Sequence, residues 1–255
     1  MKTDEQLKDI ARFIAEYATC LLGSGVHTSR VIRNSCRIGE SLGVAIKMST
    51  FQKTIVLTTR DQQSGDVHTE VIDIPSLPVN FAYNADLSAL SWEARDEHLP
   101  LATLRDKFHR VTSRPPLPPR LVLLLVGLAN ASFCRLFGGS WSAVGIVFLA
   151  TLAGVLTRQH MQRRGVNHFI IFTLAALVSS TLAASALAFD ATAEIALATS
   201  VLFLIPGVPL VNGVIDIVEG HAVIGFSRLT HAFLVIICIT VGLSCPLLLF
   251  KTSLP

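Results

Sequence analysis

A short run near the end of the chain places two prolines, a glycine, an amide and a carboxylate inside an apolar stretch. Pro206 and Pro209 flank Gly207, and Asn212 and Asp216 follow one helical turn apart. A helix interrupted by proline begins again with partial positive charge at its new N-terminus, which favours a carboxylate ligand. The run therefore predicts a substrate-binding or gating site built from these five residues.

The prolines also predict a backbone defect. They donate no hydrogen bonds, so the carbonyl oxygens around Leu202 and Ile205 are expected to lose their usual partners. In lipid such a break persists only where protein or water satisfies the freed groups. Discontinuous helices of this kind often form the central binding site of secondary transporters. A simple proline kink used for packing is the alternative.

Two further sets of polar residues are weaker candidates. Asn130 lies in an apolar run, where an amide without a partner is costly; helix packing is its other role. Arg30, Arg33 and Arg37 share one face of an expected helix and would attract an anionic substrate or lipid headgroups. A solvated face is the preferred interpretation of the arginines.

The sequence His27-Thr28-Ser29 invites a catalytic interpretation, with Asp61 or Asp66 completing a hydrolase set. No residue close in sequence completes a nucleophile–base–orienter group, so helix capping by Thr28 is the preferred interpretation. The eight histidines show no metal-ligand spacing, and no Walker A sequence is present. These patterns indicate neither a metal, nor a cofactor, nor ATP-driven chemistry.

Composition divides the chain into two halves. Residues 1–120 hold 15 of the 21 Lys and Arg and 14 of the 18 Asp and Glu, so the remainder is strongly apolar. The first half predicts an α+β domain over residues 1–113. Its expected elements are helices at 4–23 and 28–42, strands at 44–50, 54–60 and 67–74, a hairpin turn at 62–66, and helical residues 84–112 with a break near Pro100.

Four prolines mark a linker at residues 114–120, and the membrane domain is expected over residues 121–255. Five apolar runs there approach the length of about 20 residues that a spanning helix needs. They are residues 121–137, 141–157, 169–189, 195–215 and 233–250. Arginines and lysines gather before the first run and between the second and third. The positive-inside rule therefore predicts a cytosolic N-terminal domain and a C-terminus outside, in the periplasm of a bacterium. The expected fold class is thus an α-helical polytopic membrane protein with a cytosolic α+β domain.

Several segments together resemble a known family. The run Leu204 to Asn212, followed by Asp216 and Gly220-His221, resembles the hallmark of the threonine/serine exporter (ThrE) family. The pattern from Gly25 to Arg30 and the strand at 55–58 resemble its N-terminal domain. Residues 126–141 are similar to the split YjjP-type branch in particular. The resemblance covers nearly the whole chain.

The resemblance implies about ten spans, of which this chain carries five. In the split branch a second, smaller membrane subunit of the YjjB type supplies the rest, and that branch is associated with succinate export. We therefore expect a secondary exporter subunit for a small carboxylate, in the bacterial inner membrane, rather than an enzyme. A threonine/serine exporter, a membrane-tethered hydrolase and a sensor subunit remain alternatives, and a homo-oligomer stays open.

Overall fold

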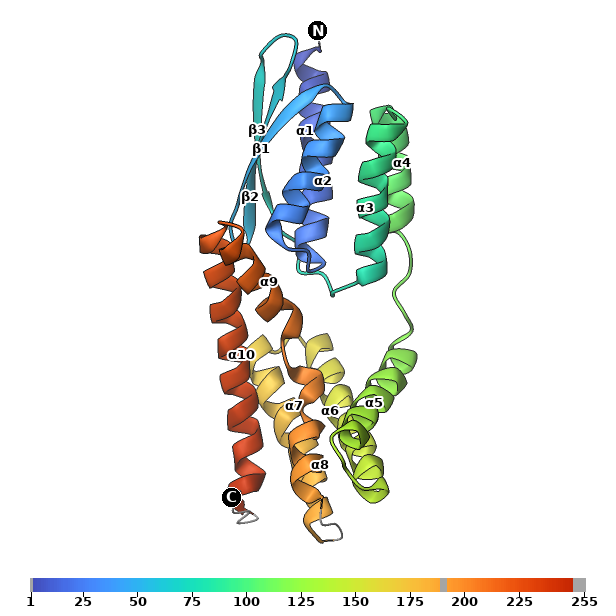
Figure 1. The fold of residues 1–255 in the computed structure, drawn as a ribbon, viewed down its shortest axis with the longest axis vertical. Coiled ribbons are helices and arrows are strands. Elements are labelled where there is room, and N and C mark those ends of the chain that lie inside the picture. Colours follow the sequence, from blue (N-terminus) through green and yellow to red (C-terminus); the bar gives the residue numbers. More distant parts are fainter. Residues whose placement is uncertain (1, 189–191, 250–255) are drawn as a thin grey trace. The chain divides into compact units, whose positions relative to one another are not determined.

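The computed structural model describes residues 2–188 and 192–249 and divides the chain into two compact units (Figure 1). The first unit combines Met1–Pro115 with Val208–Thr230. The second combines Pro116–Gly207 with His231–Pro255. The first unit thus contains a segment from the apolar half of the sequence, and the boundaries at residues 113 and 120 stay a prediction.

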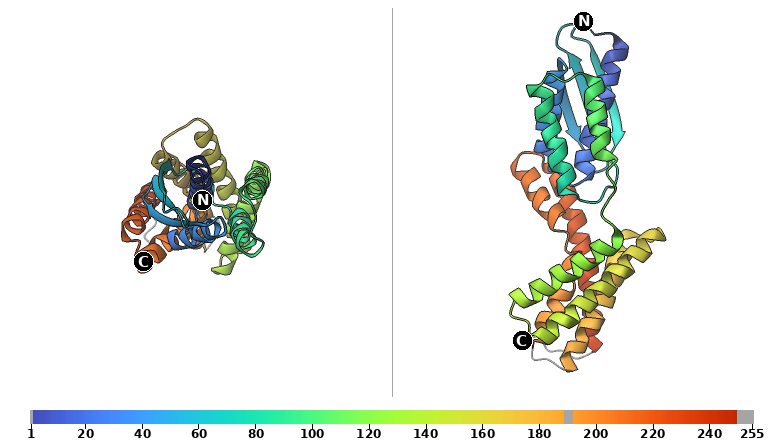
Figure 2. Two further views of the ribbon diagram at one scale, coloured as in Figure 1. Left: turned by 90° about the horizontal axis from the view of Figure 1, so that it is seen from above. Right: turned by 90° about the vertical axis from the view of Figure 1, so that its right-hand side faces the viewer.

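The first unit is layered. One face of a three-stranded sheet is covered by the helix pair α1 and α2. The second pair, α3 and α4, packs against α1 and α2 on the side away from the sheet (Figures 1 and 2). The elements are α1 (Asp4–Gly23), α2 (Thr28–Ser41), β1 (Val44–Thr50), β2 (Thr54–Asp61), β3 (Val67–Asp73), α3 (Phe81–Asp96) and α4 (Leu101–Thr112). All three predicted strands and the break near Pro100 are confirmed.

Helix α1 shows why these residues form the central layer. The Gln6 amide donates to the Thr3 hydroxyl and the Thr3 amide donates to the Gln6 side chain, which forms a capping box. Its apolar residues recur at helical spacing and are buried in the main core. The buried Tyr17 hydroxyl donates to the Leu87 carbonyl of α3 at 2.8 Å, which ties the two helical layers together.

The sheet is antiparallel, with β2 in the centre. Alternate residues of β2 are buried, as expected for a strand with one covered face. At the end of β2 the ammonium of Lys2 lies 3.1 Å from the Asp61 carboxylate and holds the pKa of Asp61 well below its usual range. This contact fixes the start of the chain to the hairpin end of the sheet.

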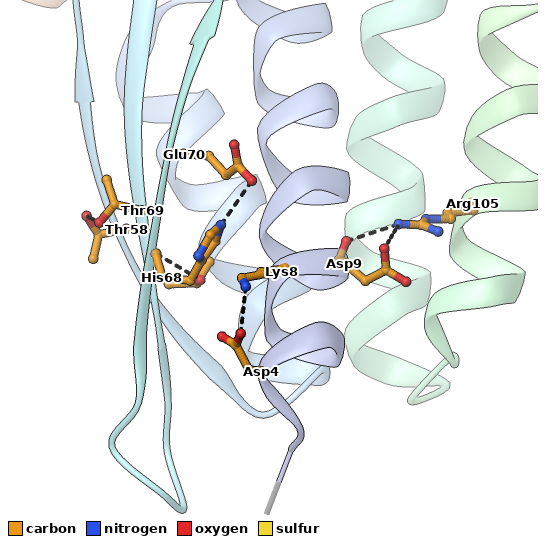
Figure 3. A network of polar contacts seen from close by, with 9 residues as sticks. Asp4, Lys8, Asp9, Thr58, His68, Thr69, Glu70 and Arg105 are labelled. Atoms are coloured by element: carbon orange, nitrogen blue, oxygen red, sulfur yellow. Dashed lines mark hydrogen bonds and ion pairs between the residues drawn. The ribbon is translucent and has the colours of Figure 1, made fainter.

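Polar contacts on the outside of this unit join residues both near and far apart in the sequence (Figure 3). Lys8 pairs with Asp4 one turn earlier in α1, at 2.6 Å. Arg105 of α4 donates to the Asp9 carbonyl at 3.1 Å. Exposed pairs of this kind contribute at most about 1 kcal/mol each. The stability of the unit therefore rests mainly on its buried apolar cluster.

The second unit is helical throughout its described residues. Its elements are α5 (Pro119–Leu136), α6 (Trp141–Arg163), α7 (His168–Ala183), η1 (Ala184–Ala188), α8 (Ala193–Ser200), η2 (Leu202–Leu204) and the later part of α10 (Ala222–Leu249). Helix α9 (Gly207–Val218) follows η2 and, from Val208 on, belongs to the first unit. Close packing uses small residues, such as Gly154 against Phe203 and Ser179.

Within the described residues, four helices are long and apolar enough to cross a membrane: α5, α6, α7 with the start of η1, and α10. The count is five if the broken pair α8–η2 and α9 forms one span. Two boundaries differ most from the predicted runs: α6 continues to Arg163, and α10 begins at Ala222 rather than Phe233. Phe189 and Phe250, which end two predicted runs, lie outside the described residues.

Candidate functional site

The fourth apolar run is interrupted where its prolines predict a break. After η2, Ile205 is extended and α9 begins at Gly207. The Ile205 amide donates to the Leu202 carbonyl at 3.1 Å, and the Gly207 amide donates to the Ile205 carbonyl at 2.9 Å. Both carbonyls thus lose their usual partners four residues on, as expected for Pro206 and Pro209, and short-range turns satisfy them instead.

Two side chains on one face of α9 bind the loop between α1 and α2. The Asn212 amide donates to the Gly25 carbonyl at 2.7 Å. Asp216, one turn later, accepts a hydrogen bond from the Thr28 backbone amide, also at 2.7 Å. All four residues belong to the first unit. The shared face expected for Asn212 and Asp216 is thus present, and it is directed at this loop.

The loop itself is shaped to receive α9. Gly25 has a φ of +92°, a conformation that suits glycine. A Cβ at this position would also lie 3.0 Å from Val79 and 3.3 Å from Val208 of α9. On the α3 side, the Asn84 amide donates to the Ser24 carbonyl at 3.2 Å. The loop is therefore held between α3 and α9.

A buried arginine completes the contact. Arg228, in the first part of α10, lies 2.8 Å from the second carboxylate oxygen of Asp216 and also donates to the Val26 carbonyl at 3.1 Å. The Asp216 side chain is fully buried, and the Arg228 side chain is 15% exposed. A buried ion pair is stable only when such additional hydrogen bonds satisfy its remaining groups. We refer to Asn212, Asp216 and Arg228 as the Asp216 cluster.

The cluster supplies the N-terminal cap of α2. The capping position is His27, whose side chain makes no capping hydrogen bond, and the buried Thr28 hydroxyl has no hydrogen-bond partner. The expected Thr28 cap is therefore wrong. The Asp216 carboxylate takes its place and also meets the positive end of the α2 dipole. A residue 188 positions away thus does what a local side chain usually does.

A second pair of contacts surrounds the cluster. His27 lies 3.2 Å from the Glu219 carboxylate, and His221 lies 3.1 Å from the Ser29 hydroxyl. The Ser29 hydroxyl, and after it His27, hold the pKa of Glu219 below its ordinary value. The turn between α9 and α10 is thereby fixed to the first turn of α2.

Replacing Glu219 with glutamine is expected to flatten the acid side of the stability profile. Because the folded pKa lies below the ordinary value of 4.5, the stabilisation is complete above that value and is lost as the pH falls through the lowered one. Between about pH 5 and pH 3 the variant should lose less stability than the wild type. Thermal unfolding at several pH values measures this.

The matched control is Glu40→Gln, at an exposed glutamate of α2 that makes no ion pair in the described part of the chain. It should leave the acid side of the profile as in the wild type. Equal flattening by both substitutions would contradict a specific role for Glu219.

The other predicted site residues are distributed over both units. Pro206 and Gly207 form the break, and Pro209 lies in the first turn of α9, where proline is well tolerated. Asn130 lies in the second unit, where its amide donates to the Thr151 hydroxyl at 3.0 Å. This bond removes the cost of burying an unpaired amide.

One of the three arginines on the basic face of α2 packs against α3. Arg37 lies over the Trp92 ring, 3.6 Å from its centroid, and donates to the Ser91 hydroxyl at 2.7 Å. Arg33 is exposed and Arg30 is half-buried. The three arginines share a face of α2 as expected, but Arg37 is committed to packing against α3.

The hydrolase alternative gains no support from the contacts of its candidate residues. His27 contacts Glu219, and Ser29 contacts His221. Asp61 binds Lys2 and Ser64 instead. Within the described residues these three candidates therefore make no hydrogen bonds with one another. The described part of the chain also contains no group of three His, Cys, Asp or Glu that could hold a metal ion.

Sequence reasoning did not select Arg228, Glu219 or His221 as site residues. A usable signal was present, since Asp216 and Arg228 carry opposite charges on the two sides of one short turn and have apolar neighbours. Opposite charges in such surroundings are usually paired.

The apolar helices and the broken α8–α9 pair define the class of the protein. It is a multi-pass membrane protein whose N-terminal α+β unit binds α9, the second half of a broken helix. The chain belongs to the ThrE family, described as "Putative threonine/serine exporter", which it matches over residues 12–249.

Two relatives extend the match. The chain is 31% identical over 247 residues to the "Probable succinate transporter subunit YjjP" of Escherichia coli K12, covering 95% of this chain and 94% of the relative. It is 29% identical over 248 residues to the protein of the same name from Klebsiella aerogenes, with 95% of each chain covered. No solved structure matches the chain. The family and these names indicate a transporter rather than an enzyme.

Proposed function

We propose that this chain is one subunit of a secondary exporter that moves a small carboxylate, succinate foremost, out of the cytosol. A second, smaller membrane subunit of the YjjB type supplies the rest of the transport path. The proposal is supported by the names of two relatives that match nearly the whole chain and include the word subunit. Threonine or serine is the alternative substrate, since the family description names these amino acids.

The observation that carries the proposal is the broken helix with its anchored second half. The α9 helix starts at Gly207 with a proline in its first turn, so its N-terminus presents partial positive charge suited to a carboxylate. Asn212 and Asp216 hold the same helix to the α1–α2 loop. In this proposal Pro206, Gly207 and Pro209 form the substrate-binding or gating segment, and the Asp216 cluster couples it to the N-terminal unit.

The proposed location is the bacterial inner membrane, with the N-terminal unit in the cytosol and the C-terminus in the periplasm. Arg114 precedes α5 and Arg120 lies in its first turn, whereas Arg163 ends α6 and Arg164 follows it. Positive charge therefore gathers on one side of the candidate spans. Export would then start from the side on which the N-terminal unit lies. A proton or ion gradient supplies the energy in this scheme.

The substrate is tested by efflux from cells that lack the chain. Labelled succinate and labelled threonine are loaded, and the chain is restored with or without the smaller subunit. Succinate efflux restored only by the pair is the expected result. Threonine efflux would instead move the assignment to amino-acid export. Restoration of neither would contradict the exporter proposal.

The site is tested in the same assay with Pro206→Ala, Gly207→Leu and Asn212→Ala. Each should lower succinate efflux at least about tenfold while the protein still inserts, because each alters the start or the anchorage of α9. A Cβ built at Gly207 meets no described atom within 4 Å, so loss of efflux in Gly207→Leu is not explained by a folding clash.

Matched controls exist in other helices. Pro246 is a proline inside α10, and Gly145 is a helical glycine of α6 with open space around it. Pro246→Ala and Gly145→Leu should export normally. Full export by all three site variants would refute the assignment of the site.

A further inference from the structure

Three basic side chains from three helices meet in the second unit, outside the site described above. They are Arg158 of α6, His168 at the start of α7 and His231 of α10. The two imidazole rings are stacked, with centroids 5.5 Å apart. The Phe172 ring lies 4.7 Å from His168 and 5.2 Å from the Arg158 guanidinium. Arg158 and His168 therefore share the Phe172 ring, and His231 stacks on His168.

No acidic residue balances this cluster. In the described residues Arg158, His168 and His231 make no ion pair and no side-chain hydrogen bond, although Arg158 is half-buried. Glu194 is the one acidic residue described in the second unit. It lies beyond Thr192, whose hydroxyl accepts from the Ser140 amide at the opposite end of α6. Uncompensated basic groups in such a position favour an anionic ligand.

The helix that carries His168 adds to this preference. Asn167 caps α7 by accepting a hydrogen bond from the Phe169 amide at 2.9 Å, and His168 is the first helical residue. The positive end of the α7 dipole is therefore directed at the cluster. Phe172 also packs in one apolar cluster with Val201 and Leu204, which lead into the helix break.

We propose that Arg158, His168 and His231 form a binding site for a small dicarboxylate. The Arg158 guanidinium would hold one carboxylate through two parallel hydrogen bonds, and the paired imidazoles would hold the other. The inference rests on the proposed function, because it assigns that function's substrate to particular residues. It also places a binding site on three helices of the second unit, separate from the break itself.

The test is equilibrium binding of labelled succinate to the purified chain, alone and together with the smaller subunit, in nanodiscs of phosphatidylcholine. Arg158→Gln should weaken binding at least about tenfold, since a charge-assisted pair of hydrogen bonds is lost. The double variant His168→Asn with His231→Asn should do the same. Arg158→Lys, which keeps the charge and the stem, should fold normally and bind at an intermediate level.

Arg163→Gln is the matched control. Arg163 is an exposed arginine at the end of α6, so this substitution removes the same charge outside the cluster. It should bind succinate like the wild type. Equal weakening by Arg158→Gln and Arg163→Gln, or normal binding by the double histidine variant, would overturn the site.

Two further arms separate the remaining outcomes. Nanodiscs that contain phosphatidylglycerol test whether a lipid headgroup occupies the cluster. If this lipid binds there and succinate does not displace it, the cluster is not a substrate site. Phosphate and threonine are tested as ligands that compete with labelled succinate, on the wild type and on the same variants. Arg158-dependent binding of one of them without succinate binding would reject the dicarboxylate assignments here and in the proposed function while leaving an anion site. Succinate export with Arg158-independent binding would reject this site alone.

Discussion

Asp216→Ala is expected to lower the free energy of unfolding of the first unit by about 3–5 kcal/mol, the usual cost of leaving one member of a buried ion pair unpaired. The substitution strands the Arg228 guanidinium, which is 15% exposed, and removes the acceptor of the Thr28 amide. Loss of an N-terminal cap alone costs about 1 kcal/mol. Chemical unfolding of the purified protein, with hydrogen exchange at the first amides of α2, measures both effects.

Two variants separate the charge from the cap. Asp216→Asn keeps an oxygen that can accept from Thr28 but loses the negative charge, so it should retain more protection at the start of α2 than Asp216→Ala. The double variant Asp216→Leu with Arg228→Met removes both charges and should be more stable than Asp216→Leu or Arg228→Met alone. If the double variant is as unstable as the sum of the two single variants, the pair is not coupled.

Gly242→Ala is expected to destabilise the second unit by about 1–3 kcal/mol or more, through overpacking. A Cβ at Gly242 of α10 would collide with the Thr173 carbonyl oxygen and lie 2.8 Å from the Ala176 Cβ and 2.9 Å from the Leu177 amide nitrogen. Two of these atoms belong to the α7 backbone, which cannot move aside as a flexible side chain can. Unfolding in mixed detergent micelles measures the loss.

Gly145→Ala is the matched control for this substitution. Gly145 is also a helical glycine in a candidate span, but a Cβ there meets no described atom within 4 Å. It should be neutral or stabilising by up to about 1 kcal/mol, because alanine favours the helix. Equal destabilisation at both positions would show that the close contact between α7 and α10 is not the cause.

Local sequence patterns predicted local structure well. The apolar spacing of α1, the β-branched residues of β2 and the prolines at the start of α9 each determine structure within a few residues, and the helix, the strand and the break they predict are confirmed. Such features depend on backbone sterics and on which face is buried, and both can be inferred from nearby residues.

Contacts between distant residues could not be inferred in this way. Thr28 is a good capping residue by type, yet its amide is bound by Asp216 and its hydroxyl has no hydrogen-bond partner. In the sequence Arg158 is one of several basic residues between two apolar runs, yet it lies beside Phe172 and near two histidines. In both cases tertiary packing decides the outcome, and a single sequence contains no direct record of which helices meet.

The cap of α2 by Asp216 has a consequence for how the protein is made. The sheet and the first four helices precede residue 116, so they leave the ribosome long before Asp216 and Arg228 are synthesised. Until then the Thr28 amide has no carboxylate to bind. Maturation of the N-terminal unit thus depends on delivery of a downstream segment that follows three of the candidate spans. A nascent chain whose later helices fail to insert would keep an unfinished domain, which quality-control proteases can recognise.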